Sequence, residues 1–202
     1  MGVRRGAALA LGFAGLLAAA GWVKETRPQP VLQATQATTE IPADQLLDVG
    51  VHIFDPGLPK GIEDDLDMQD KIRIYPDIRQ AEARYMAMQL RDTLEDTGQW
   101  GTARVVPASV NSFDLAVDAK IVESNGAYLK LEVTARDATG KVWIDKKEFE
   151  GQADTRVYRD NYTAGRDPFE NVYVLIANDL LAVRSQKSGT ELANIRHVSE
   201  MR

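Results

Sequence analysis

The sequence predicts an α+β fold: an antiparallel or mixed sheet of four to five strands with two main helices on one face, in the order β-α-β-β-β-β-α. Apolar and polar residues alternate on successive arms between residues 113 and 149, as in strands with one buried face. Two longer segments, 77–97 and 169–186, carry apolar residues at the three- and four-residue spacing of a helix that covers a sheet.

The first strand is expected at Leu46–Phe54, and the turn sequence Asp55-Pro56-Gly57 ends it. The alternation places one set of side chains in the core and the other set, with Asp48, Gly50 and His52, on the polar face. The expected core set is Leu47, Val49, Val51 and Ile53.

Residues 58–76 are expected to form a long polar connection, rich in carboxylates between positions 63 and 70. Such a cluster can hold calcium, but the Gly-centred turn and terminal Glu of an EF-hand loop are missing, so a solvated acidic loop is expected. Lys71–Tyr75 is expected to form a short edge strand. The acidic residues are Glu63, Asp64, Asp65, Asp67 and Asp70.

A helix is predicted over Asp77–Thr97, with Gly98 as its C-cap. Its broad apolar stripe is expected to lie on the sheet, with a Met-rich binding face as the alternative. Trp100 follows the cap, and Thr102–Val106 is predicted to be a strand. The stripe comprises Ile78, Ala81, Tyr85, Met86, Met88, Leu90 and Leu94.

Three consecutive strands form a predicted meander over Phe113–Val122, Tyr128–Arg136 and Lys141–Phe149. Asn125-Gly126 supplies residues that tolerate the positive φ of a tight hairpin, and Asp137–Gly140 makes the second turn. The meander is expected to have one buried face and one wet, charged face.

The segment after the meander, residues 150–166, is polar and carries Tyr158 and Tyr162, which either contact a partner or pack over the sheet edge. A second helix is predicted from Asp167-Pro168, an N-cap followed by a proline, to near Gln186. A short third helix without a stop signal is expected after it, so either the chain ends early or this helix needs a partner. Its apolar residues are Leu192, Ile195 and Val198.

The first 21 residues, 1–21, have the pattern of a secretory signal. Arg4-Arg5 precedes an uncharged run of Ala, Leu, Gly and Phe, and small residues precede a cut after Ala20. An uncleaved membrane anchor through residues 6–21 is the alternative, because the run approaches a spanning length. Trp22 stands where a lipidated protein has cysteine, so lipidation is not expected.

The rest of the 202-residue chain is expected to divide into a flexible linker over 22–44, an α+β domain over 45–187 and a C-terminal helical extension over 188–202. The net charge of −6, without a concentrated basic patch, argues against nucleic-acid binding. The absence of cysteine from the sequence excludes disulfides, thiolate metal sites and cysteine nucleophiles.

The sequence predicts no catalytic, cofactor-binding or metal-binding residue. His52 and His197 lie far apart in sequence, and no shared metal or acid–base role is expected. A nucleophile elbow and phosphate-binding glycine loops are missing. Four charged residues on the wet strand faces suit cross-strand pairing better than catalysis, which needs a pocket that drives their pKa values apart. They are Asp114, Asp118, Glu132 and Arg136.

The runs Phe113–Ile121, Leu129–Val133 and Asp137–Trp143 together resemble a pattern of bacterial envelope proteins. The pattern is similar to the amino-terminal domain of the Tol translocation protein, and to the curli-secretion, penicillin-binding-protein activator and ABC-transporter auxiliary lipoproteins. The resemblance spans about residues 46–181. It implies a non-enzymatic part of an envelope machine that binds other proteins, and it transfers no binding residues because the shared motif is structural.

The predicted function is therefore a non-enzymatic exported accessory or docking protein of the bacterial cell envelope, in the periplasm or at the outer surface of a membrane. Its candidate surfaces are the wet sheet face, the acidic loop 58–70 and the segment 156–166. A periplasmic small-ligand or lipid carrier is the alternative, and a hydrolase ranks last. A carrier is expected to hold an apolar cavity between the helix at 77–97 and the meander, whereas a docking domain is expected to be solid there and to show an apolar surface patch.

Overall fold

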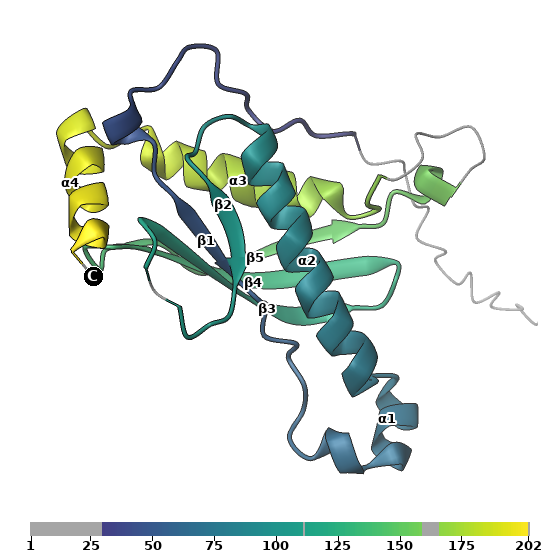
Figure 1. Cartoon of the computed structure of the whole chain (residues 1–202). Coiled ribbons are helices and arrows are strands. Elements are labelled where there is room, and N and C mark those ends of the chain that lie inside the picture. The colour runs from purple at the N-terminus through teal and green to yellow at the C-terminus, as the bar shows by residue number, and fades with distance from the viewer. Residues whose placement is uncertain (1–29, 111, 159–165, 202) are drawn as a thin grey trace, which may run out of the picture.

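A single mixed sheet of five strands organises the computed structural model, which describes residues 30–110, 112–158 and 166–201. The spatial order is β2-β1-β3-β4-β5 (Figure 1). β1 pairs in parallel with β2 and β3, while β3, β4 and β5 form an antiparallel meander. The strands are β1 (Val49–His52), β2 (Ala103–Val106), β3 (Leu115–Ser124), β4 (Tyr128–Asp137) and β5 (Val142–Gln152).

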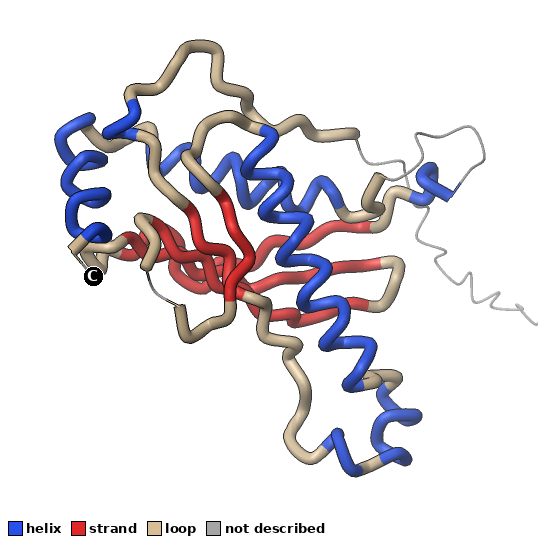
Figure 2. Tube along the Cα trace, in the orientation of Figure 1, coloured by secondary structure: helices blue, strands red, loops and turns tan. Residues whose placement is uncertain are grey.

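Two long helices lie on one face of this sheet (Figure 2), which confirms the predicted α+β class. α2 packs on β1 and β2, and α3 packs on β5 and on α2. A short helix precedes α2 and another follows α3, so the predicted order of main elements is kept. The helices are α1 (Leu66–Ile72), α2 (Pro76–Asp96), α3 (Glu170–Arg184) and α4 (Gly189–Glu200).

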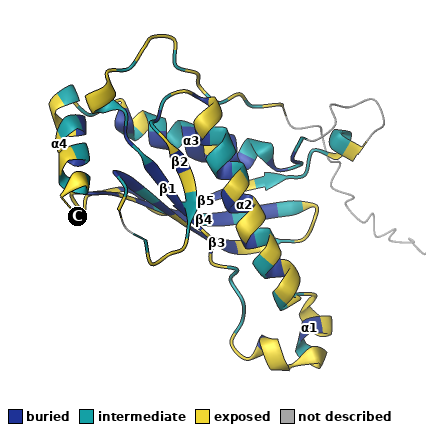
Figure 3. Cartoon of the chain, in the orientation of Figure 1, coloured by how far each residue is buried: buried dark blue, intermediate teal, exposed yellow. Residues whose placement is uncertain are grey.

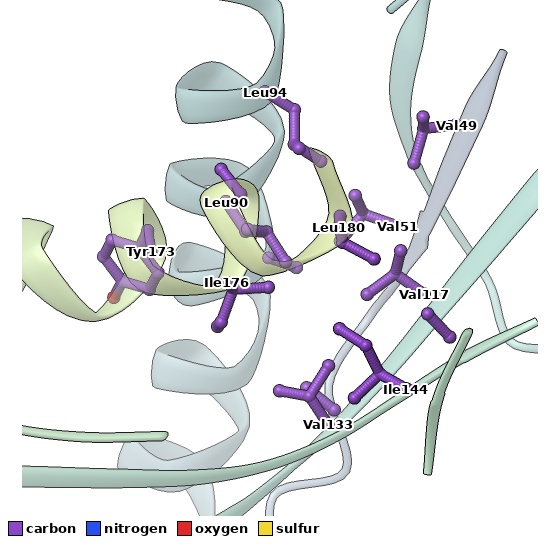
Figure 4. Close-up of a cluster of buried hydrophobic side chains, with 14 of the residues drawn as sticks. Val49, Val51, Leu90, Leu94, Val117, Val133, Ile144, Tyr173, Ile176 and Leu180 are labelled. Atoms are coloured by element: carbon purple, nitrogen blue, oxygen red, sulfur yellow. The ribbon is translucent and has the colours of Figure 1, made fainter. Parts of the chain in front are cut away.

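The core fills the space between the sheet and these two helices (Figure 4). Leu90 and Leu94 of α2 and Ile176 of α3 point toward the same strand residues, and none of the three is exposed. Alternation along each strand supplies the facing side chains. The strand residues in this part of the core are Val49, Val51, Val117, Val133 and Ile144.

Two local predictions are wrong. The Ile53 side chain is exposed and Phe54 is buried instead, because β1 ends at His52 and the Asp55 amide donates to the carbonyl of Ala119 on β3. Lys71–Tyr75 is not an edge strand. Its first two residues finish α1, which begins where the Asp65 carboxylate accepts a hydrogen bond from the Met68 amide.

The turn between β4 and β5 is built around the buried carboxylate of Asp137. This carboxylate accepts hydrogen bonds from the Thr139 amide at 2.9 Å, the Lys141 amide at 3.1 Å and the Trp143 indole N–H at 2.7 Å. Thr139 also donates through its hydroxyl at 2.6 Å. The side chain therefore closes the turn and satisfies the one polar atom of a core tryptophan.

We expect the substitution Asp137→Ala to lower the free energy of unfolding by about 2–3 kcal/mol, because it leaves the buried Trp143 indole N–H without an acceptor. Urea unfolding measures the change. Asp145→Ala on the exposed part of β5 is the control and should change stability by less than about 0.5 kcal/mol. Equal effects of the two substitutions would contradict this account of the turn.

Candidate functional site

Helix α2 has two apolar faces, and only one of them lies in the core. Ala83, Met86, Ala87, Leu90 and Leu94 are buried. The other apolar residues recur at spacings of three, four and three, which at 100° per residue places them on the side opposite the core. They are Ile78, Ala81, Tyr85 and Met88.

These four residues are all exposed, so the prediction that they face the sheet is wrong. Ile78 is 59% exposed, Tyr85 48% and Met88 46%. Met86, Leu90 and Leu94 of the predicted stripe do lie in the core. Ala83 and Ala87, which the prediction did not include, complete the inner face.

The exposed face of α2 continues onto α1 (Figure 3), where it again includes apolar residues. Leu66 is 73% exposed, and Ile72 and Tyr75 are also exposed. Together the 3-10 turn Ile62–Asp64, α1 and the first half of α2 form a projection that we call the arm, residues 62–88. Figure 1 shows its α1 end extending beyond the sheet. Such a concentration of exposed apolar side chains marks a contact surface more often than chance.

The arm is an ordered structure, because it contains buried residues of its own. Ile62 is completely buried, and the buried Gln69 amide donates to the Ile62 carbonyl at 2.8 Å. At the other end, the buried Arg79 guanidinium donates to the Ser124 carbonyl at 3.2 Å and thereby fixes α2 to the β3–β4 hairpin. The exposed residues between these points are therefore held in a defined arrangement.

The arm is acidic around α1. Between residues 62 and 72, five carboxylates stand against the single cation Lys71. The predicted acidic loop is thus partly helical, and its side chains have local tasks: Asp65 caps α1, and Asp70 accepts a hydrogen bond from the Tyr75 hydroxyl at 3.1 Å. Within the described residues, no group of three or more His, Asp or Glu side chains is arranged to hold a metal ion.

Tyr85 links the arm to the start of α3. Its ring is half exposed, while its hydroxyl donates a hydrogen bond to the buried Asp167 carboxylate. Partial burial and this carboxylate raise the pKa of Tyr85 to about 12. Burial also raises the pKa of Asp167 above its ordinary value. The Tyr85 ring is therefore held at a fixed position on the outer face of α2.

The other sheet face, which the sequence predicts to be wet, is partly covered. The Phe113 ring lies over Gly50, where an added Cβ would come within 2.3 Å of a ring carbon. His52 is only 4% exposed rather than on the surface as predicted. Its Nδ1 lies 2.7 Å from an Asp118 carboxylate oxygen, and its Nε2 lies 2.9 Å from the Val110 carbonyl oxygen.

This His52–Asp118 pair has the outline of a catalytic dyad, but its second nitrogen is occupied. A carbonyl oxygen can only accept, so Nε2 carries its hydrogen and donates it to Val110. Nδ1 faces a carboxylate, which also accepts, so the doubly protonated imidazolium fits best. The hydrogen bond to Asp118 accordingly raises the pKa of His52 above 6.5, against the effect of burial. The imidazole therefore connects the turn at residues 107–110 to the sheet, and neither of its ring nitrogens is free to act as a base.

The remaining predicted residues do not form a common site. Asp114 is buried rather than wet, and its carboxylate accepts from the Asp48 amide at 2.7 Å. Glu132 stands opposite Lys120 across the β3–β4 ladder, and the Arg136 guanidinium donates to the Gly140 carbonyl. The His197 side chain is exposed on α4.

The tyrosine-bearing segment 156–166 is described only in part. Tyr158 ends a short 3-10 turn and is 68% exposed. Tyr162 and the predicted signal or anchor at residues 1–21 lie outside the described residues. Among the helices that the structure does describe, none is long and apolar enough to cross a membrane.

Comparison with known proteins adds one structural likeness. No family model matches the sequence, and no curated protein matches it. The fold is similar to the crystal structure of protein XCC0632 from Xanthomonas campestris, a DUF330 protein, with 10% sequence identity and a TM-score of 0.42. The match covers 78% of this chain and 95% of that chain. No family assignment and no function follow from it.

We expect Asp118→Asn to lower the pKa of His52, because it removes the main cause of the upward shift and leaves burial opposing the charge. The wild-type His52 stabilises the fold fully below pH 6.5, and this contribution is lost as the pH rises through the higher folded-state pKa. NMR titration of the His52 ring carbons measures the pKa. Glu132→Gln on the same sheet face is the control, and an unchanged pKa in Asp118→Asn would refute the assignment.

Proposed function

We propose that this protein is a non-enzymatic exported docking domain of the bacterial cell envelope, and that the arm, residues 62–88, is its contact surface. The observation that carries the proposal is the heptad-spaced apolar stripe on the outer face of α2, continuous with exposed apolar residues of α1. Burying these side chains against a partner removes apolar area from water, which is the main driving force of protein association.

The chemistry of the partner follows from the arm. An apolar groove fits the stripe of Ile78, Tyr85 and Met88, and basic side chains at its rim complement the carboxylates around α1. The same negative charge disfavours binding to an anionic lipid surface. The compartment rests on the signal pattern of residues 1–21 and on the resemblance of the meander to envelope proteins.

A carrier role has less support. The space between α2 and the meander, where a carried ligand is expected, is filled by buried side chains such as Met86, Leu90 and Leu131. Within the described part of the chain, surface cavities of about 260–600 Å³ lie instead along residues 30–46 and beside α4. The His52 geometry likewise offers no base for an enzyme, so a docking role is the better account of the described residues.

Site-specific crosslinking in intact envelopes tests the proposal. A photo-reactive residue at Met88 should capture a discrete partner. The double substitution Ile78→Ser with Tyr75→Ser should reduce that capture tenfold or more, because each change removes about 1–1.5 kcal/mol of the binding free energy that apolar burial contributes. A photo-reactive residue at Val122, which is 48% exposed on β3, is the matched control and should capture little.

The expected capture falls with added salt, since charge complementarity at the rim is screened. Unfolding midpoints of the variants should stay close to wild type, because Ile78 and Tyr75 are exposed and lie outside the buried apolar cluster. Equal capture at Met88 and Val122, or capture that Ile78→Ser and Tyr75→Ser leave unchanged, would contradict the proposal.

A further inference from the structure

The outer surface of α3 holds an extended segment of the same chain by its backbone. The Asn171 side chain accepts a hydrogen bond from the Leu32 amide and donates one to the Pro30 carbonyl, both at 2.9 Å. Asn178 repeats the arrangement: it accepts from the Thr35 amide at 2.9 Å and donates to the Gln33 carbonyl at 3.4 Å. Residues 30–37 thus lie along α3 although nothing in their sequence predicts it.

The spacing of the two asparagines matches a particular backbone conformation. Seven residues of α-helix rise about 10.5 Å. The backbone groups that the asparagines bind recur every three residues, from Pro30 to Gln33 and from Leu32 to Thr35. A polyproline II helix has three residues per turn and rises about 3.1 Å per residue, or about 9.3 Å per turn, which is close to the rise between the two asparagines. A β-strand instead presents the same side every two residues.

The contacts leave the identity of the bound side chains open. All four hydrogen bonds go to backbone atoms, so any extended segment with free N–H groups at two positions three apart satisfies them. Two surface cavities flank the segment: one of about 260 Å³ lies beside Leu32 and Leu175, and one of about 340 Å³ lies beside Val31 and Val174. Larger side chains than those of residues 31–34 would fit there.

Residues 30–37 are held weakly enough for another segment to replace them on α3. The four hydrogen bonds from the two asparagines are exposed or only half-buried, where water competes for the same groups. Beyond α3, the segment makes two further bonds to residues that the structure describes: the Ala37 amide donates to the Thr97 carbonyl at 2.8 Å, and the Gln99 side chain donates to the Thr35 carbonyl at 3.5 Å. Ordering these eight residues costs conformational entropy, which offsets part of the free energy that the hydrogen bonds contribute. The segment also adds nothing to the buried apolar cluster, whose first residue in the sequence is Leu47. Release of residues 30–37 therefore leaves the core intact.

We propose that the Asn171/Asn178 face of α3 is a binding site for a polyproline II-type segment of another protein, and that residues 30–37 occupy this site until such a segment displaces them. The two asparagines fix the backbone register. The cavities beside Leu175 and Val174 select bulkier apolar side chains in the incoming segment. This site lies on α3, separate from the arm.

The test uses the full chain and a fluorescent peptide with the sequence of residues 30–37. The chain variant Leu32→Pro with Thr35→Pro removes both bound amide hydrogens but keeps an extended backbone, so its own segment releases α3. The matched control, Gln33→Pro with Gln36→Pro, places prolines where the amides make no bond to the asparagines. Fluorescence anisotropy measures binding of the peptide to each chain.

The Leu32→Pro, Thr35→Pro chain should bind the peptide at least tenfold more tightly than the wild type or the control. Adding Asn171→Ala and Asn178→Ala should abolish binding, while Ile78→Ser on the arm should not affect it. A peptide carrying Leu32→Phe should bind more tightly because it fills the cavity beside Leu175. Binding that survives loss of both asparagines would overturn the proposal.

Two further outcomes would also overturn it. If the Leu32→Pro, Thr35→Pro chain binds the peptide no better than wild type, α3 does not act as a separable site. If the wild-type chain forms a concentration-dependent dimer in sedimentation that this variant loses, the occupant is residues 30–37 of a second copy and not a segment of another protein.

Discussion

The packing of α2 against β1 and β2 is the contact on which the rest of the structure depends. This helix has 21 residues, about 31 Å in length, and its inner face begins to touch the body of the domain only at Arg79. The part that precedes Arg79 carries α1 beyond the sheet. One buried stripe of Ala83, Ala87, Leu90 and Leu94 therefore both closes the core and holds the arm in place.

Because α2 uses one face for the core, its opposite face needs a separate explanation. Tyr85 and Met88 leave apolar area exposed to water. Their positions are nevertheless defined, because the Tyr85 hydroxyl donates a hydrogen bond to Asp167 and Arg79 fixes α2 to the β3–β4 hairpin. The outer face of α3 is also in use, since Asn171 and Asn178 bind the backbone of residues 30–37, which lie outside the core. Both proposals thus place association on the outer surfaces of the two helices, while their inner surfaces carry the stability.

The meander was predictable from sequence because its signal is local. Period-two alternation and the turns at Asn125-Gly126 and Asp137–Gly140 define three strands without reference to the rest of the chain. The separation of the apolar residues of α2 into two faces was not predictable, since both sets have helical spacing and both include large side chains, such as Leu90 inside and Tyr85 outside. Burial of His52 and docking of residues 30–37 depend on partners 58 to 145 positions away in sequence, which no local pattern encodes.

Thiol reactivity along α2 tests the central claim most directly, because the native chain has no cysteine. Single cysteines at positions 78, 81, 85 and 88 would sample the outer face, and those at 83, 87, 90 and 94 the inner face. The account predicts that outer-face thiols react with a thiol reagent at nearly the rate of an unfolded peptide, while inner-face thiols react only through unfolding. Similar reaction rates on the two faces would contradict the account.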